Sequence, residues 1–260
     1  MKFPKRSLGQ NFLIDFNIIR KIVNTVKIKN KNIIEIGPGE GALTDELLKR
    51  EPKTLVLIEK DNELSKKLKI KYYFKKNIKI LNKDILNFKL EQNLLKDTII
   101  FGNLPYNISS QILIQTLKFN KWPPSYSDII FMFQKELGEK ILGKFGSSEY
   151  GRLSILTNYR FLSKKKFIVS PNSFFPRPKV NSMVIHFKPK ENNQYKIKKI
   201  QNLELITRTL FSNKRKMINK NIQKILDKDK LNKLDINLQL RPSELRPEVY
   251  YKIAKLIEKD

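Results

Sequence analysis

Four short apolar runs, separated by polar or helical stretches, constrain the fold of this chain more than any other feature. The runs are Asn32–Ile36, Thr54–Ile58, Ile78–Leu81 and Thr98–Phe101. Apolar runs of this length beside turn residues are typical of buried strands, and their regular alternation with helices predicts a mostly parallel sheet. The alternation continues to about Leu142, with Asp128–Phe133 as the next strand. We therefore expect an α/β fold.

The sheet is expected to close with Lys166–Val169 and Ser182–Phe187, which brings the predicted strands to seven. A polar stretch, Lys190–Gln194, then marks a domain boundary. Residues 1–189 are thus predicted to form the sheet domain and residues 190–260 a small all-α domain of about three helices. Asp15 should cap a helix from Phe16 to about Val26, and Ser109 or Ser110 should cap the helix after the fourth run.

Each of the four runs is followed by residues suited to ligand binding. The glycine-rich turn Gly37–Gly41 follows the first run, Glu59 the second, Asp84 the third and Asn103 the fourth. The carboxyl ends of parallel strands line one crevice, where glycines allow close approach of a ligand and an acid after the second strand can grip a ribose diol. The spacing G-x-G-x-G is neither the dinucleotide-binding pattern nor a phosphate loop. Asp84 is placed to accept from the amine of an adenine ring.

The tetrapeptide Asn103-Leu104-Pro105-Tyr106 gives the clearest chemical indication. The side-chain carbonyl of Asn103 and the backbone carbonyl of Leu104, held at a fixed angle by Pro105, provide two acceptors for the N–H groups of an exocyclic amine. The amine nitrogen is a weak nucleophile because its lone pair is delocalised into the ring. Two such acceptors favour a pyramidal nitrogen whose lone pair points out of the ring plane, which makes the nitrogen more nucleophilic. Tyr106 offers a face on which the base can stack. A plain turn at the end of a strand is the alternative.

Together with four flanking segments, these motifs resemble the ribosomal RNA adenine dimethyltransferase family along nearly the whole chain. The segments are Lys5–Asp15, Phe174–Val180, Leu210–Lys216 and Leu240–Leu245. The last two are more similar to the small-subunit branch than to the macrolide-resistance methylases of the large subunit. The resemblance implies a class I, Rossmann-like methyltransferase domain that uses S-adenosylmethionine. It also implies dimethylation at N6 of two adjacent adenosines near the 3′ end of small-subunit (16S) rRNA, with a role in small-subunit biogenesis.

The same resemblance assigns residues to the cofactor and to the target base. Those expected to border the cofactor are Asn11, Leu13, Gly37, Glu59, Asp84 and Asn103. Those expected to act on the base are Asn103, Leu104, Pro105, Tyr106 and Phe175. Phe175 is the candidate for the face of the base opposite Tyr106, with core packing beside Phe174 as the alternative. Lys214, Arg215 and Lys216 are expected to touch RNA phosphates, with a solvated helix face as the alternative.

Composition excludes several classes of catalyst and favours a polyanionic partner. The chain has no cysteine and one histidine, which argues against a zinc site and against cysteine catalysis. His186 lies in an alternating apolar strand, so a structural role is expected. The net charge of +28 favours RNA, although a coding bias toward lysine would also produce it. Without a signal segment or a spanning apolar run, we expect a cytoplasmic protein that does not bind a membrane. We also expect it to be a monomer without a metal.

Three other functions remain open from the sequence. A large-subunit rRNA dimethylase would share the whole catalytic core. A DNA adenine methylase would share the Asn103 turn, although the small C-terminal domain does not suggest a module that reads bases. A ribosome-assembly or nucleic-acid-binding factor without catalysis would also have a high positive charge, but it would have no use for the four motifs at the strand ends.

Overall fold

The computed structural model describes residues 9–191, 193–234 and 236–258, and the chain divides into two compact units. The first comprises Met1–Gly138 and Ser163–Pro189, and the second Glu139–Leu162 and Lys190–Asp260. The break after Pro189 lies where the sequence places the domain boundary. Residues 139–162, however, group with the C-terminal part, because helix α6 (Arg152–Arg160) packs on helices of that part. The motif residues Lys5–Leu8 and the rest of the first eight residues lie outside the described chain.

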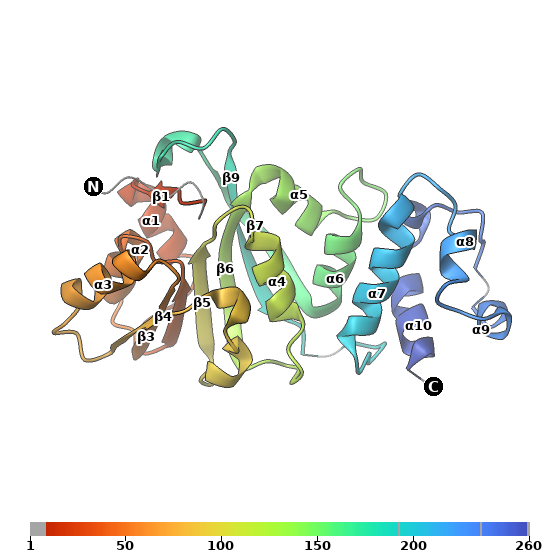
Figure 1. Cartoon of the computed structure of the whole chain (residues 1–260), viewed down its shortest axis with the longest axis horizontal. Coiled ribbons are helices and arrows are strands. Elements are labelled where there is room, and N and C mark those ends of the chain that lie inside the picture. Colours follow the sequence, from red (N-terminus) through yellow and green to blue (C-terminus); the bar gives the residue numbers. More distant parts are fainter. Residues whose placement is uncertain (1–8, 192, 235, 259–260) are drawn as a thin grey trace. The chain divides into compact units, whose positions relative to one another are not determined.

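A seven-stranded sheet forms the centre of the first unit, in the order β4-β3-β2-β5-β6-β9-β7 (Figure 1). Its strands are β2 (Asn32–Ile36), β3 (Thr54–Glu59), β4 (Ile78–Asn82), β5 (Thr98–Asn103), β6 (Tyr126–Gln134), β7 (Phe161–Val169) and β9 (Ser182–Pro189). Neighbours from β4 to β6 pair in parallel, and β9 pairs antiparallel with β6. The expected mostly parallel sheet is confirmed, and all seven predicted runs lie within strands.

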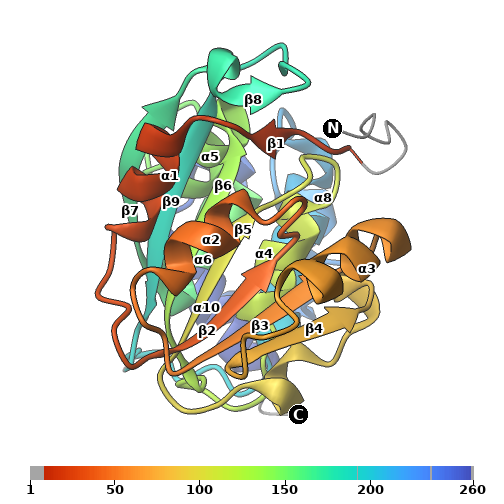
Figure 2. The same ribbon diagram turned by 90° about the vertical axis from the view of Figure 1, so that its left-hand side faces the viewer.

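Helices α1 (Phe16–Val23), α2 (Ala42–Leu48) and α3 (Asn62–Lys71) share one apolar cluster with the sheet. The cluster includes Ile22 of α1, Leu47 of α2 and Leu68 of α3, which pack on alternate residues of the strands. Helix α4 (Ser109–Leu117) follows β5, and helix α5 (Lys135–Leu142) follows β6 (Figures 1 and 2). This arrangement leaves the carboxyl ends of β2–β5 open for a ligand.

One of the two predicted helix caps is confirmed and the other is wrong. The carboxylate of Asp15 accepts hydrogen bonds from the backbone N–H groups of Asn17 and Ile18, as expected of a cap. Helix α4 is instead preceded by Ile108, whose side chain makes no capping bond. The hydroxyl of Ser109 donates to the carbonyl of Tyr106 at 3.1 Å and stabilises the preceding turn.

A second, two-stranded sheet joins the N-terminal arm to the segment before β9. Strand β1 (Phe12–Leu13) pairs antiparallel with β8 (Phe174–Phe175), so that Phe12 lies opposite Phe175. The pairing extends further, because the N–H of Ile14 donates to the carbonyl of Ser173 at 2.9 Å. This sheet was not among the elements expected from the sequence. It brings together two segments that the sequence assigns to the cofactor and to the target base.

The second unit consists mainly of helices, as predicted. They are α6, α7 (Ile200–Leu210), α8 (Asn219–Ile222), α9 (Lys228–Asn232) and α10 (Pro247–Ile257), preceded by the end of α5. Apolar residues of α7 and α10 form its core, and the buried hydroxyl of Tyr251 donates to the carbonyl of Ile155 at 3.2 Å. Within the described residues, no helix is both long and apolar enough to cross a membrane.

Candidate active site

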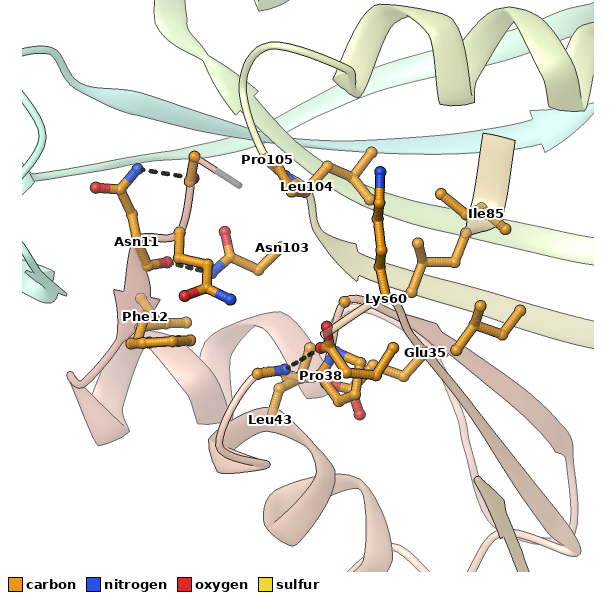
Figure 3. A pocket seen from close by; sticks show the side chains of 18 of the residues that line it. Asn11, Phe12, Glu35, Pro38, Leu43, Lys60, Ile85, Asn103, Leu104 and Pro105 are labelled. Atoms are coloured by element: carbon orange, nitrogen blue, oxygen red, sulfur yellow. Dashed lines mark hydrogen bonds between the residues drawn. The ribbon is translucent and has the colours of Figure 1, made fainter. Parts of the chain in front are cut away.

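A cavity of about 360 Å³ lies at the carboxyl ends of β2–β5, within the size range of small-molecule sites (Figure 3). It collects nine of the ten site residues predicted from the sequence, which come from four strand ends and from the N-terminal arm. They are Asn11, Leu13, Gly37, Glu59, Asp84, Asn103, Leu104, Pro105 and Tyr106. The rule that parallel strand ends meet in one crevice therefore located the cavity correctly.

The glycine-rich turn has a backbone conformation that side chains would disturb. Gly37, Gly39 and Gly41 have φ values of +69°, +59° and +87°. A Cβ atom on Gly39 would lie 2.8 Å from the ring of Phe12, so the missing side chain makes room for β1. A Cβ on Gly37 would point to within 3.8 Å of the Asn103 carbonyl oxygen. The turn therefore lies against both the arm and the Asn103 turn.

Glu59 is buried at the end of β3 and is held by the backbone. Its carboxylate accepts from the N–H of Asp61 at 2.8 Å and from the N–H of Gly39 at 3.2 Å. Burial raises the pKa of the carboxyl, and the two N–H donors oppose that rise. A carboxylate has further lone pairs, so Glu59 can still accept from ligand hydroxyls. The bond to Gly39 also fixes the glycine turn relative to β3.

Asp84 forms an ion pair that sequence reasoning did not predict. Its carboxylate lies 2.8 Å from the Nζ atom of Lys60 and also accepts from the N–H of Leu86 at 3.0 Å. The bond from Lys60 lowers the pKa of the Asp84 carboxyl. Lys60 and Ile85 line the cavity beside Asp84. The side chain is therefore an ionised acceptor beside an apolar surface, which suits the amine edge of a purine.

The side chain of Asn103 is oriented by the N-terminal arm. Its Nδ2 atom donates to the backbone carbonyl of Asn11 at 3.1 Å (Figure 3). An amide whose nitrogen is committed in this way presents its carbonyl oxygen as the remaining functional group. Among the described residues, no donor is bonded to that oxygen. Asn103 therefore has its acceptor available in the cavity, as the sequence predicts for a group that binds an exocyclic amine.

The rest of the tetrapeptide is held by local packing and by one distant hydrogen bond. Leu104 is buried, and its side chain covers Gly102, where a Cβ would lie only 2.6 Å from it. The hydroxyls of Tyr106 and Ser182 are 2.6 Å apart, and Ser182 is fully buried at the start of β9. Ser182 thus fixes the orientation of the Tyr106 ring. Sequence reasoning missed it because the partners are 76 residues apart.

Phe175 is the one predicted residue that does not line the cavity. It is 42% exposed and pairs with Phe12, which does line the cavity. Its exposure argues against the alternative, in which Phe175 packs in the core; the neighbouring residue Phe174 is the buried one of the two. Phe175 therefore lies beside a cavity residue, with much of its surface exposed.

Glu35 is a further cavity residue that sequence reasoning missed. It lies in β2, two residues before Gly37, and is completely buried. The hydroxyl of Thr44 donates to it at 2.7 Å, while burial raises the pKa of the carboxyl to about 8. The sequence did contain an indication of this residue. A carboxyl group inside an apolar run is costly in free energy to bury unless it is hydrogen-bonded, so its presence there indicates a specific role.

The sequence and the geometry have clear counterparts among known proteins. A model of the family described as "Ribosomal RNA adenine dimethylase" matches residues 2–259. The chain belongs to this family. A "Ribosomal RNA small subunit methyltransferase A" from Pelagibacter ubique is 46% identical, over 98% of this chain and 97% of the relative. The protein of the same name from Malacoplasma penetrans is 38% identical, over 97% and 91%.

Solved structures agree with this assignment. A dimethyladenosine transferase from Plasmodium falciparum superposes with a TM-score of 0.75 at 26% identity, covering 93% of this chain and 95% of that one. The 23S rRNA methyltransferase ErmE superposes with a TM-score of 0.68 at 23% identity, covering 95% and 99%, which establishes similarity of fold only. The enzyme is therefore a methyltransferase of Rossmann-like class I fold, and its cofactor is S-adenosylmethionine.

The lining of the cavity fits this cofactor. Buried Glu59 and ionised Asp84 are hydrogen-bond acceptors of the kind that ribose hydroxyls and an adenine amine require, and Ile85 adds an apolar side chain to the lining. The backbone of the glycine turn lines the cavity, and a Cβ at Gly37 would lie at ordinary contact distance, 3.8 Å, from the backbone carbonyl oxygen of Asn103.

The described residues contain no cluster of His, Asp and Glu that could hold a metal ion. The ring Nε2 of His186 lies 2.7 Å from the carboxylate of Asp128. His186 is buried in β9 and lies outside the cavity residues.

Proposed function

We propose that the enzyme transfers methyl groups to N6 of two adjacent adenosines near the 3′ end of small-subunit rRNA, giving dimethyladenosines. The observation that carries the chemistry is the orientation of Asn103. Its side-chain nitrogen donates to the backbone carbonyl of Asn11 at 3.1 Å, and no donor among the described residues is bonded to its side-chain oxygen, while Asn103 itself lines the cavity. Asn103 is therefore the residue at which the proposed cofactor-binding residues adjoin the proposed binding site of the target amine.

The residues of the cavity have separate tasks in this proposal. S-adenosylmethionine, when bound, supplies an electrophilic methyl group on its sulfonium. Gly37, Glu59 and Asp84 would hold it along the ends of β2, β3 and β4. Asn11 and Leu13 would border it from the arm. Binding of this kind places the two reactants in contact, which is a large part of what an enzyme contributes to a transfer reaction.

The target adenosine would be extruded from its RNA to reach the cavity. The Asn103 side chain and the Leu104 carbonyl accept from its two N–H groups, so that the nitrogen lone pair is directed out of the ring plane. Tyr106 stacks on one face of the base and Phe175 on the other, at the edge of the site. No strong base is needed before attack, because the product ammonium can lose its proton to water.

The choice of the small subunit rests on the relatives that bear that name and align over nearly their whole length. Similarity to ErmE covers the C-terminal part as well, so the fold does not separate the two ribosomal substrates. We propose further that the enzyme acts as a cytoplasmic monomer during small-subunit biogenesis. Exposed Lys214, Arg215 and Lys216 of the second unit would contact RNA phosphates in this role.

A labelling experiment tests the proposal. The protein is incubated with labelled S-adenosylmethionine and unmethylated small subunits, with large subunits and duplex DNA in parallel, and the labelled nucleotide is mapped. Dimethyladenosine confined to small-subunit rRNA is expected. Label in large-subunit rRNA or in DNA would refute the proposed substrate. Binding without label anywhere would favour a non-catalytic assembly factor.

A further inference from the structure

An exposed aromatic and basic surface lies at the carboxyl end of α3, outside the cavity residues. It consists of Ile70, Tyr73, Phe74, Lys75 and Lys76 and is called here the α3 platform; α3 is the orange helix on the right of Figure 2. Its three apolar side chains are 79%, 78% and 90% exposed. Single exposed apolar residues are common on protein surfaces, whereas a cluster of them indicates an interaction site.

The α3 platform is held in place by its buried neighbour Tyr72. The hydroxyl of Tyr72 lies 2.8 Å from the carboxylate of Asp45 and 3.2 Å from the carbonyl of Gly41. The turn after it is also bonded, with the N–H of Lys75 donating to the Tyr72 carbonyl at 2.9 Å. The exposed rings therefore stand on an ordered turn, which reduces the entropy lost when they bind a partner.

The charge around the rings favours a polyanion. Residues 65–81 include seven lysines and no acidic residue. Lys71 is paired with Asp45 at 2.6 Å, but within the described chain Lys75 and Lys76 form no ion pair. A second copy of the chain would bring an equally positive surface to this one, which disfavours self-association. A negatively charged partner with flat apolar groups has the complementary chemistry.

We propose that the α3 platform binds an unpaired segment of the RNA substrate, with a base stacked on Phe74 and phosphates contacted by Lys75 and Lys76. Unpaired bases offer free faces for aromatic rings, and stacking combined with lysine contacts binds single strands with little sequence preference. The rings of Tyr73 and Phe74 are 5.1 Å apart and nearly perpendicular, so each presents its own face.

The platform adjoins the cofactor half of the active site through Lys71, whose Nζ donates to the carbonyl of the cavity residue Glu40 at 3.3 Å. The inference rests on the proposed function only for the identity of the RNA.

The first test compares a Tyr73→Ser, Phe74→Ser variant with Leu95→Ser, which changes another exposed apolar residue. Binding and methylation are measured with unmethylated small subunits and with their deproteinised rRNA at one salt concentration. Loss of a stacked base should weaken binding by the aromatic variant about fivefold or more. Its turnover at saturating RNA and its affinity for S-adenosylmethionine should not change, and Leu95→Ser should behave as the wild type.

A second pair of variants separates stacking from charge. Phe74→Trp keeps an aromatic face and should show fluorescence quenching when unstructured oligouridylate is added, beyond that of the native Trp122. Lys75→Gln with Lys76→Gln should reduce the slope of log affinity against log salt by about 1.4, the value for two phosphate contacts on a single strand. The aromatic variant should leave that slope unchanged.

Equal binding by the aromatic variant and the wild type would refute the proposal. A loss seen with intact subunits but not with deproteinised rRNA would assign the platform to a ribosomal protein instead, and would also refute it. A different result would refute the proposed function: the wild-type protein would methylate no small-subunit rRNA. Quenching of the Phe74→Trp variant by oligouridylate would support the platform even in that case.

Discussion

Ser182→Ala and Tyr106→Phe remove the two partners of one hydrogen bond, and we expect them to impair catalysis equally and not additively. The hydroxyls are 2.6 Å apart, and Ser182 does not itself line the cavity, so among the described residues its link to the proposed base site is the bond to Tyr106. Ser182 is therefore a positioning residue. Its contribution is the orientation of an aromatic ring that is to stack on the target base.

The size of the effect follows from the type of bond. A neutral hydrogen bond contributes about 0.5–1.5 kcal/mol, and about 1.4 kcal/mol corresponds to a tenfold change in rate. Each single variant should thus lower kcat/KM for RNA by up to about tenfold. The double variant should be no slower than the more impaired single variant, because the bond can be lost only once.

The assay is a double-mutant cycle on kcat/KM for small subunits, with the affinity for S-adenosylmethionine as the internal control. Tyr106→Phe leaves the buried Ser182 hydroxyl without a partner, so melting temperatures are measured in parallel. Cofactor affinity should be unchanged in all variants. Multiplicative losses, about a hundredfold in the double variant, would refute the reasoning.

Three further predictions address other parts of the site. Asn103→Ala should abolish methyl transfer while calorimetry finds cofactor affinity largely retained, since the lost acceptor serves the amine; an equal loss of cofactor affinity would contradict this. Glu35 is buried with a pKa raised to about 8 from an ordinary value of 4.5, so the folded state favours its protonated form and stability should fall as pH rises from 4.5 to 8. Glu35→Gln should flatten that dependence in thermal melts, and an unchanged pH profile would count against it. Gly39→Ala should raise KM for S-adenosylmethionine, because the new Cβ would lie 2.8 Å from the Phe12 ring and displace β1; Gly146→Ala, which meets nothing within 4 Å at a similarly positive φ, is the matched control.

Local patterns predicted the sheet and most of the cavity. An apolar run with a turn residue beside it indicates a buried strand without knowledge of its neighbours, and parallel strands share one ligand-binding edge. Glu59, Asp84 and Asn103 could therefore be placed together from the sequence. Phe175 was assigned to the site by resemblance alone, and its role on the base stays a prediction.

Contacts between distant segments could not be predicted in this way. The bonds from Asn103 to Asn11 and from Tyr106 to Ser182 join residues 92 and 76 positions apart. The spacing of apolar residues along the sequence carries no information about such a pairing. The predicted cap at Ser109 or Ser110 was wrong for a related reason. A serine hydroxyl at the start of a helix can bond either to the helix or to the preceding turn, and the hydroxyl of Ser109 donates to the carbonyl of Tyr106 in that turn.

Dimethylation of one adenosine consumes two molecules of cofactor, so the spent cofactor must leave between the transfers. Asn11 and Leu13 border the cavity, and the arm that carries them is paired with the strand of Phe175. Under the proposed function, opening of the arm to release spent cofactor would disturb its pairing with the strand of Phe175 and would withdraw the carbonyl that orients Asn103. The target base would then be held less tightly while the cofactor exchanges. The enzyme should work distributively, releasing monomethylated RNA before it returns for the second methyl group.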